Sequence, residues 1–148
     1  DRVLALESAQ HFKPLSDFIM ESKRILMKNG IFVLAIPVTL GESSFKKLGL
    51  LKFTWSSEHY DLDYLKNLLN SNGFSISSET LIGSNVYDPL ADYYEKNRSS
   101  LKKLILNQYS SYVEKILFKS IKKMKKASQD NIIDYVLLKC TLKSNLSD

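Results

Sequence analysis

Two side chains near the start of the sequence have the chemistry of a catalytic site, a carboxylate and an imidazole. Glu7 directly follows the apolar run Val3–Leu6, and His11 lies four positions after Glu7. An imidazole titrates near neutral pH, so His11 is the residue best suited to remove a proton from a bound substrate. The alternative is a structural histidine that hydrogen-bonds the backbone of its loop. Glu7 could likewise be satisfied by nearby backbone amides.

The residues around this pair predict a strand, a helix and a second strand. Val3–Leu6 is typical of a strand buried on both faces, and residues 15–26 carry apolar side chains at helical spacing. Asn29-Gly30 supplies the left-handed residue that ends a helix, and Ile31–Ile36 is the second apolar strand. Pro37 is expected to stop its ladder. Because this order builds a parallel sheet, the carboxylate and imidazole should lie at its carboxyl edge, where open α/β sheets hold ligands.

The middle of the chain predicts a loop, a helix and an edge strand. Residues 38–60 read as irregular, and Asp61 is a good cap for a helix that stops at Asn72-Gly73. Phe74–Ile82 alternates imperfectly, as a strand near the edge of a sheet does. Loops over the carboxyl edge often shape a ligand pocket. The candidate acceptor contacts in this loop are Trp55, His59 and Tyr60.

The last third predicts a helical insertion over residues 84–127 and a final strand, Ile132–Leu142. Tyr94 lies in this insertion, where aromatic side chains could enclose a flat or lipid-like acceptor. Leu101–Lys126 reads as one amphipathic helix with eight lysines and a single acid, Glu114. It could be a lid helix packed on the sheet with a solvated lysine face. It could instead make a peripheral membrane or phosphate contact, as a non-catalytic binding module would.

Composition narrows the functional classes. The net charge of the 148 residues is +5, but outside Leu101–Lys126 there are 13 basic and 15 acidic residues, so no nucleic-acid partner is expected. The single cysteine, Cys140, excludes an internal disulfide and favours the reducing cytoplasm. Two histidines and one cysteine without ligand spacing predict no metal site. No apolar stretch is long enough to span a bilayer.

One ordered set of residues resembles the middle of class I S-adenosylmethionine-dependent methyltransferases. The resemblance is greatest to the small-molecule group that includes quinone, tocopherol and sterol methyltransferases. Lys28-Asn29-Gly30 keeps that group's turn before strand five without its proline. The set comprises ALESAQHF at 5–12, Phe18, Glu21, Arg24-Ile25-Leu26, Gly30 and Ile31–Ile36, followed by Gly73-Phe74 and Tyr135–Leu138.

The resemblance implies an α/β fold, the rear part of a Rossmann-like methyltransferase sheet. This part comprises strands four to seven, in the spatial order four, five, seven, six, with the last strand antiparallel and a helical insertion before it. The family's glycine-rich cofactor loop and its ribose-binding acid have no counterpart here. We therefore expect a C-terminal fragment, preceded in the intact enzyme by ~100 residues. This chain alone should be close to inactive.

The resemblance also implies a reaction and its residues. The intact enzyme would transfer a methyl group from S-adenosylmethionine to O or C of a small acceptor, which a hydrophobic pocket would suit. Leu6 and Glu7 would face the methionine portion of the cofactor, and His11 would be the base. In a rear-half fragment the outer edge of Arg2–Leu6 would be unpaired, which favours a homodimer.

Overall fold

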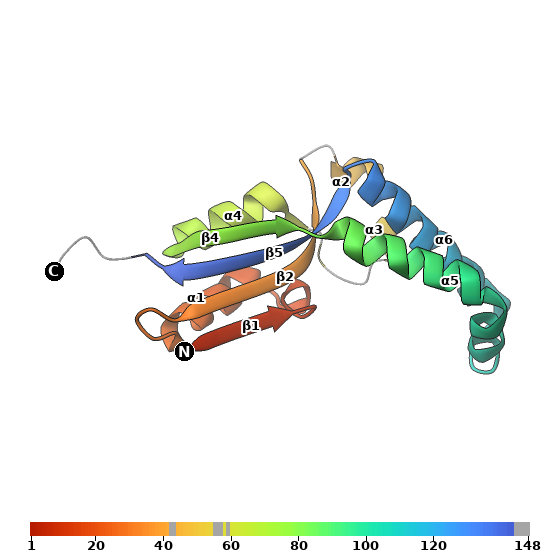
Figure 1. Ribbon diagram of the computed structural model, residues 1–148, viewed down its shortest axis with the longest axis horizontal. Coiled ribbons are helices and arrows are strands. Elements are labelled where there is room, and N and C mark those ends of the chain that lie inside the picture. The colour runs from red at the N-terminus through yellow and green to blue at the C-terminus, as the bar shows by residue number, and fades with distance from the viewer. Residues whose placement is uncertain (42–43, 55–57, 59, 144–148) are drawn as a thin grey trace.

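The computed structural model describes residues 1–41, 44–54, 58 and 60–143, and it contains one mixed sheet with helices on both faces (Figure 1). In chain order the elements are β1 (Arg2–Leu6), the 3-10 helix η1 (Ala9–His11), α1 (Leu15–Ile25), β2 (Ile31–Thr39), α2 (Ser44–Lys47), α3 (Leu51–Thr54), β3 (Tyr60–Asp61), α4 (Leu62–Ser71), β4 (Phe74–Leu81), α5 (Gly83–Leu106), α6 (Ser111–Gln129) and β5 (Ile133–Leu142).

The strands lie in the order β1-β2-β5-β4, with the short β3 paired to the end of β2. β1 and β2 are parallel, from Arg2 opposite Ile31 to Leu6 opposite Ala35. β5 is antiparallel to both of its neighbours, β2 and β4. The parallel unit, the edge position of β4 and the antiparallel last strand are therefore confirmed, as is the α/β fold with a helical insertion.

The main core lies between one face of the sheet and the helices α1 and α4, which Figure 1 shows on the same side of the strands. Phe32 of β2 and Phe74 of β4 are fully buried, with ring centroids 5.2 Å apart. The helices contribute fully or almost fully buried aliphatic side chains, among them Leu15, Ile19, Leu65 and Leu69. This layer holds the parallel strands in place beneath the candidate site.

Among the described residues, the opposite face of the sheet is covered only near the carboxyl end of β2. Ala35, Tyr87 and Tyr135 pack there with side chains of α3 and α6. Further along this face, Leu4 and Leu6 of β1 are 62% and 57% exposed. The prediction that Val3–Leu6 is buried on both faces is thus wrong, because no described element covers this side of β1.

Two boundary signals in the sequence had different outcomes. Asp61 caps α4 as predicted, since its carboxylate accepts hydrogen bonds from the amides of Asp63 (3.0 Å) and Tyr64 (3.3 Å). Helix α1, however, ends at Ile25, four residues before the left-handed Asn29, which has a φ of 68°. Ile25, the last residue of the helix, is 53% exposed, whereas Leu26 directly after it is buried.

Residues 38–60 contain more regular structure than predicted, and β2 itself continues through Pro37 to Thr39. The Ala35 carbonyl accepts a hydrogen bond from the Glu7 amide, so it faces β1. Backbone groups two residues apart in a strand point to the same side, so the backbone nitrogen of Pro37 also points toward the side of β2 on which β1 lies. The pairing with β1 ends at Ala35, so no β1 residue is opposite Pro37. Its missing N–H consequently removes no bond to β5, and the proline is tolerated.

The basic segment Leu101–Lys126 is not one helix. Residues 107–110 form a turn between α5 and α6, and the two helices pack together as a hairpin that extends away from the sheet (Figure 1). The predicted apolar stripe is divided by this turn, so part of it faces solvent: Leu104 is 65% exposed and Tyr112 is 70% exposed. A single lid helix packed along the sheet is therefore wrong.

An ion pair and two rings hold the hairpin together. Arg98 donates two hydrogen bonds to the fully buried Glu114 carboxylate, at 2.9 and 3.3 Å. The guanidinium lies 3.6 Å from the ring centroid of Phe118, which also packs against Tyr94. Arg98 holds the pKa of the Glu114 carboxyl below its ordinary value.

Candidate functional site at the carboxyl edge of the sheet

Glu7 lies where β1 ends, in a left-handed backbone conformation with a φ of 53°. Its amide donates to the Ala35 carbonyl at 3.1 Å, which keeps it attached to β2. Its carboxylate is exposed and accepts a hydrogen bond from the Gln10 side-chain amide at 3.2 Å. Gln10 is only 3% exposed, and its amide oxygen has no partner in the described part of the chain. A buried acceptor of this kind requires a donor, which a ligand or water can supply.

Two buried tyrosines lie beside the Glu7 carboxylate. The Tyr135 hydroxyl donates to the Ala35 carbonyl at 3.0 Å, and the Tyr87 hydroxyl donates to the Asp134 carbonyl at 3.4 Å. Burial, and after it the neighbouring Glu7, raises the pKa of both phenols well above the ordinary value. Both hydroxyls therefore stay protonated at neutral pH and act as donors, not as bases.

The start of α5 is fixed by Asp134, which places Tyr87 at the site. The Asp134 carboxylate accepts a hydrogen bond from the Gly83 amide at 2.7 Å, close to the positive end of the helix dipole. A Cβ at Gly83 would lie 2.7 Å from the same carboxylate oxygen and 2.9 Å from the Ser128 hydroxyl. Glycine is thus required here, because only a residue without a side chain permits this close approach.

His11 and Tyr60 lie on adjoining segments of the same edge. His11 is exposed at the end of η1, and its imidazole makes no hydrogen bond to any residue that the structure describes. The Tyr60 hydroxyl donates to the Phe12 carbonyl at 3.5 Å, and the Glu58 amide donates to the Gln10 carbonyl at 3.2 Å. Burial and then the nearby Glu58 raise the pKa of the Tyr60 phenol. Glu58 and Tyr60 are therefore both tied to the segment that carries His11.

The remaining residues predicted for the site are placed differently. Leu6 ends β1 with an exposed side chain next to Glu7. Tyr94 lies in the hairpin, 7% exposed and packed on Phe118, and its hydroxyl has no partner among the described residues. Trp55 and His59 lie outside the described residues. The structure thus gathers Leu6, Glu7, His11 and Tyr60 around one edge and leaves Tyr94 in another environment.

Sequence reasoning overlooked Gln10, Tyr87 and Tyr135 as members of the site. A signal existed for Tyr135, because a tyrosine inside an aliphatic buried strand needs a partner for its hydroxyl. No pattern in the neighbouring sequence indicates that the Gln10 side chain is buried. No group of three or more potential metal ligands is found in residues 1–41, 44–54, 58 and 60–143.

Comparisons with known proteins show what fold carries this site. Neither a protein-family model nor a curated protein matches the sequence. Solved structures that are similar include the mycolic acid cyclopropane synthase CmaA1, with a TM-score of 0.81 at 17% identity over 95% of this chain and 54% of that chain. The phosphoethanolamine N-methyltransferase 2 of Haemonchus contortus gives 0.75 at 16% identity, over 97% and 33%. The [4+2]-cyclase SpnF gives 0.70 at 16% identity, over 98% and 50%.

The chain spans about half, or less, of the length of these solved structures. Because their sequence identities are only 16–17%, the likeness establishes the fold alone and not the activity. It is the Rossmann-like fold of class I S-adenosylmethionine-dependent methyltransferases.

Proposed function

We propose that this chain belongs to an enzyme that transfers a methyl group from S-adenosylmethionine to O or C of a small acceptor. The observation that carries the proposal is the carboxyl edge of β1, where Glu7 and the unpartnered Gln10 oxygen lie in this fold. Two of the similar structures contain S-adenosylhomocysteine (SAH). CmaA1 holds it in one of its structures, and the Haemonchus enzyme holds it together with phosphomonomethylethanolamine. Because the cyclase SpnF has the same fold, the fold alone does not decide the reaction.

The residues at this edge fit one end of the cofactor. The Glu7 carboxylate and the orphan Gln10 oxygen are both hydrogen-bond acceptors, which suits the ammonium group of the cofactor's amino-acid portion. The exposed Leu6 side chain offers an apolar contact beside them. When bound, S-adenosylmethionine supplies an electrophilic methyl group. We propose that the glycine-rich loop holding the rest of the cofactor belongs to a part of the protein that precedes this chain.

His11 is proposed as the base that removes a proton from a hydroxyl or carbon acceptor. Its exposed position at the end of η1, without a hydrogen bond to a described residue, leaves the imidazole available for an acceptor. Tyr60, in the adjoining β3, can contact an acceptor held over this edge, and Trp55 and His59 are proposed for the same role. Tyr94 stays a proposal that requires an acceptor long enough to reach the hairpin. A small hydrophobic acceptor would suit these side chains.

The His11→Ala variant tests the reaction and the base together, in the natural protein that contains this sequence. With labelled S-adenosylmethionine and a panel of small phenol and lipid acceptors, kcat should fall about 100-fold or more, because a positioned base contributes about that factor. The Kd for S-adenosylhomocysteine should not change. Glu21→Ala, on the exposed surface of α1, is the matched control. An equal loss of turnover and of cofactor binding would remove the base assignment. Failure of the unaltered protein to methylate any acceptor would reject the proposed reaction.

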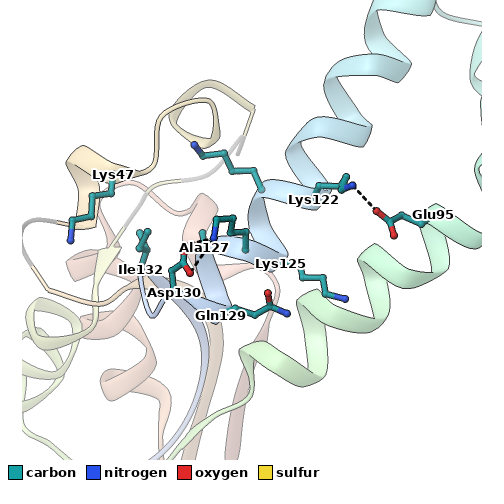
Figure 2. A pocket seen from close by; sticks show the side chains of 10 residues that line it. Lys47, Glu95, Lys122, Lys125, Ala127, Gln129, Asp130 and Ile132 are labelled. Carbon is teal, nitrogen blue, oxygen red and sulfur yellow. Dashed lines mark hydrogen bonds and ion pairs between the residues drawn. The ribbon is translucent and has the colours of Figure 1, made fainter.

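A lysine-lined pocket favours a second candidate function, a non-catalytic module that binds a phosphate or another small anion. This pocket has a volume of about 530 Å³ and lies at the end of α6. Figure 2 shows its lining side chains, Ala127 and Ile132 among them. Its lysines are Lys47, Lys122, Lys123, Lys125 and Lys126. Three are neutralised: Lys122 by Glu95 (3.0 Å), Lys125 by Asp92 (2.6 Å) and Lys126 by Asp130 (3.2 Å).

The other two lysines carry the anion-binding candidate. Lys47 and Lys123 make no ion pair with a residue that the structure describes, so the pocket retains two uncompensated ammonium groups. Pyrophosphate titrated at low salt should bind the unaltered chain and bind the Lys47→Ala/Lys123→Ala variant much more weakly. Lys28→Ala, exposed and remote in sequence, serves as the control. No difference between the two variants would eliminate this site.

Two further expectations stand as proposals about the chain by itself. The outer edge of β1 has no partner strand in the described part of the chain, and Leu4 beside it is exposed, so we propose a homodimer through this edge. Light scattering should then give twice the mass of one chain, and Leu4→Lys should lower it to the mass of one chain. We also propose a cytoplasmic location, which was expected from the single cysteine. Cell fractionation checks it.

A further inference from the structure

The end of the α5–α6 hairpin exposes a group of large apolar side chains. We define the hairpin tip as residues 101–119, the part that lies furthest from the sheet in Figure 1. Within it, five large apolar or aromatic side chains are between 41% and 70% exposed. These are Leu104 (65%), Leu106 (43%), Tyr109 (58%), Tyr112 (70%) and Leu117 (41%). The hairpin contact buries only part of the apolar stripe, so the tip presents an apolar surface with no partner among the described residues.

The solvent-facing charges of the tip are all positive. Lys102, Lys103, Lys115 and Lys119 are exposed and make no ion pair with a described residue. The tip's one acid, Glu114, is fully buried and neutralised by Arg98. The base of the hairpin differs, because three of its lysines are each paired with a carboxylate. The tip therefore combines exposed apolar groups with uncompensated positive charge.

The tip is held as a formed unit. The Arg98–Glu114 pair crosses between α5 and α6, and the Arg98 guanidinium covers the Phe118 ring at 3.6 Å. The 24 residues of α5 make a helix about 36 Å long at 1.5 Å per residue, so the tip is carried well away from the carboxyl edge of β1. A contact made by the tip would thus leave the candidate site accessible.

We propose that the hairpin tip docks on an anionic lipid bilayer. Its leucines would enter the boundary of the acyl chains, its tyrosines would lie at headgroup level, and its lysines would meet anionic headgroups. No helix in the described part of the chain is long and apolar enough to cross a membrane. The proposal does not depend on the methyl-transfer reaction.

The charge and the apolar groups of the tip together favour a lipid bilayer over a second copy of the chain or a nucleic acid as its partner. A second copy of the tip would bring four uncompensated lysines against four others, which is repulsive. A nucleic acid would satisfy the lysines but would leave Leu104, Leu106 and Leu117 without an apolar partner. An anionic bilayer complements both features, because it offers negative headgroups above an apolar interior.

Vesicle flotation tests the proposal on the full 148-residue chain. Vesicles of phosphatidylcholine with about one third phosphatidylserine should bind the chain, and pure phosphatidylcholine should bind it far less. Lys102→Gln and Lys115→Gln should each weaken binding about fivefold. Leu104→Ser/Tyr112→Ser should remove the binding that survives ~0.5 M salt, at which exposed charges are screened. The control, Met20→Ser/Met27→Ser, removes two apolar side chains that are 51% and 61% exposed on and after α1.

Tryptophan fluorescence measures how deeply the hairpin tip enters the bilayer, independently of the affinity for the vesicles. In a Trp55→Phe background, Tyr112→Trp should shift to the blue and be quenched by brominated lipids, whereas Tyr93→Trp, 60% exposed further down α5, should not. Circular dichroism confirms that each variant is folded. Equal binding by the tip and control variants, or equal response of the two tryptophans, would overturn the proposal. It would also be overturned if the chain did not bind the anionic vesicles, or if Leu104→Ser/Tyr112→Ser instead abolished self-association measured without lipid.

Discussion

Replacing Tyr135 with phenylalanine removes one hydroxyl from the candidate site and leaves the packing of the ring in place. This hydroxyl donates to the Ala35 carbonyl at 3.0 Å, and Tyr135 is only 5% exposed. The same carbonyl also accepts the Glu7 amide at 3.1 Å, so it keeps one partner in the variant. We therefore expect the loss of one ordinary buried hydrogen bond, about 1 kcal/mol, and not the larger penalty of about 1–3 kcal/mol for an orphaned carbonyl.

Urea denaturation followed by circular dichroism measures this free energy of unfolding directly. A loss of about 1 kcal/mol corresponds to about 3 °C in Tm for a chain of this size. Tyr87→Phe should lose less, because its hydroxyl lies 3.4 Å from the Asp134 carbonyl, a longer and weaker bond. Tyr112→Phe, 70% exposed, is the control and should change nothing. If Tyr135→Phe were as stable as this control, or lost more than about 3 kcal/mol, the reasoning about the shared carbonyl would be refuted.

Three other predictions concern stability and reactivity. Phe32→Ala should destabilise the chain by about 3–5 kcal/mol in urea, because Phe32 is fully buried against Phe74, and a loss below about 1 kcal/mol would contradict the core described here. Arg98 lowers the folded-state pKa of Glu114, so the stabilisation is present above the ordinary carboxyl pKa and is lost as pH falls through the folded value. Tm measured across acid pH should show this loss, and Glu114→Gln should lack that contribution to it. Burial raises the pKa of the Cys140 thiol to about 11, so it should react with a disulfide reagent at pH 8 only after unfolding.

Local sequence patterns were sufficient for much of the fold. Val3–Leu6 and Ile31–Ile36 were recognisable as strands from their apolar runs, and the single helix between them favoured the parallel pairing that the structure has. Asp61 was recognisable as a cap because its chemistry acts on amides only two and three residues away. Such features depend on residues that are close in the sequence, so the sequence predicts them well.

The features that were predicted wrongly depend on distant parts of the chain. Leu4 and Leu6 have the composition of buried strand residues, but burial depends on whether another layer covers β1. The helical periodicity of residues 101–126 continues through the turn at 107–110, so periodicity did not reveal the hairpin.

The candidate site shows the same limit. Tyr135 contacts Ala35 across 100 positions of sequence, and no local pattern brings these two residues to Glu7. Glu7 and His11 could be chosen from the sequence because Glu7 directly follows a strand and His11 lies only four positions later. Their buried neighbours became visible only when the strands were placed side by side.

Calorimetric titration of S-adenosylhomocysteine into the natural protein that contains this sequence tests the central proposal most directly. The unaltered protein should bind, and Glu7→Gln should bind about 10-fold or more weakly, since a hydrogen bond to a charged group contributes about 1.5–3 kcal/mol. Glu21→Gln, which alters an exposed carboxylate on α1, should bind like the unaltered protein. An unaltered protein that does not bind, or a Glu7→Gln variant with full affinity, would contradict a cofactor site at the carboxyl edge of β1.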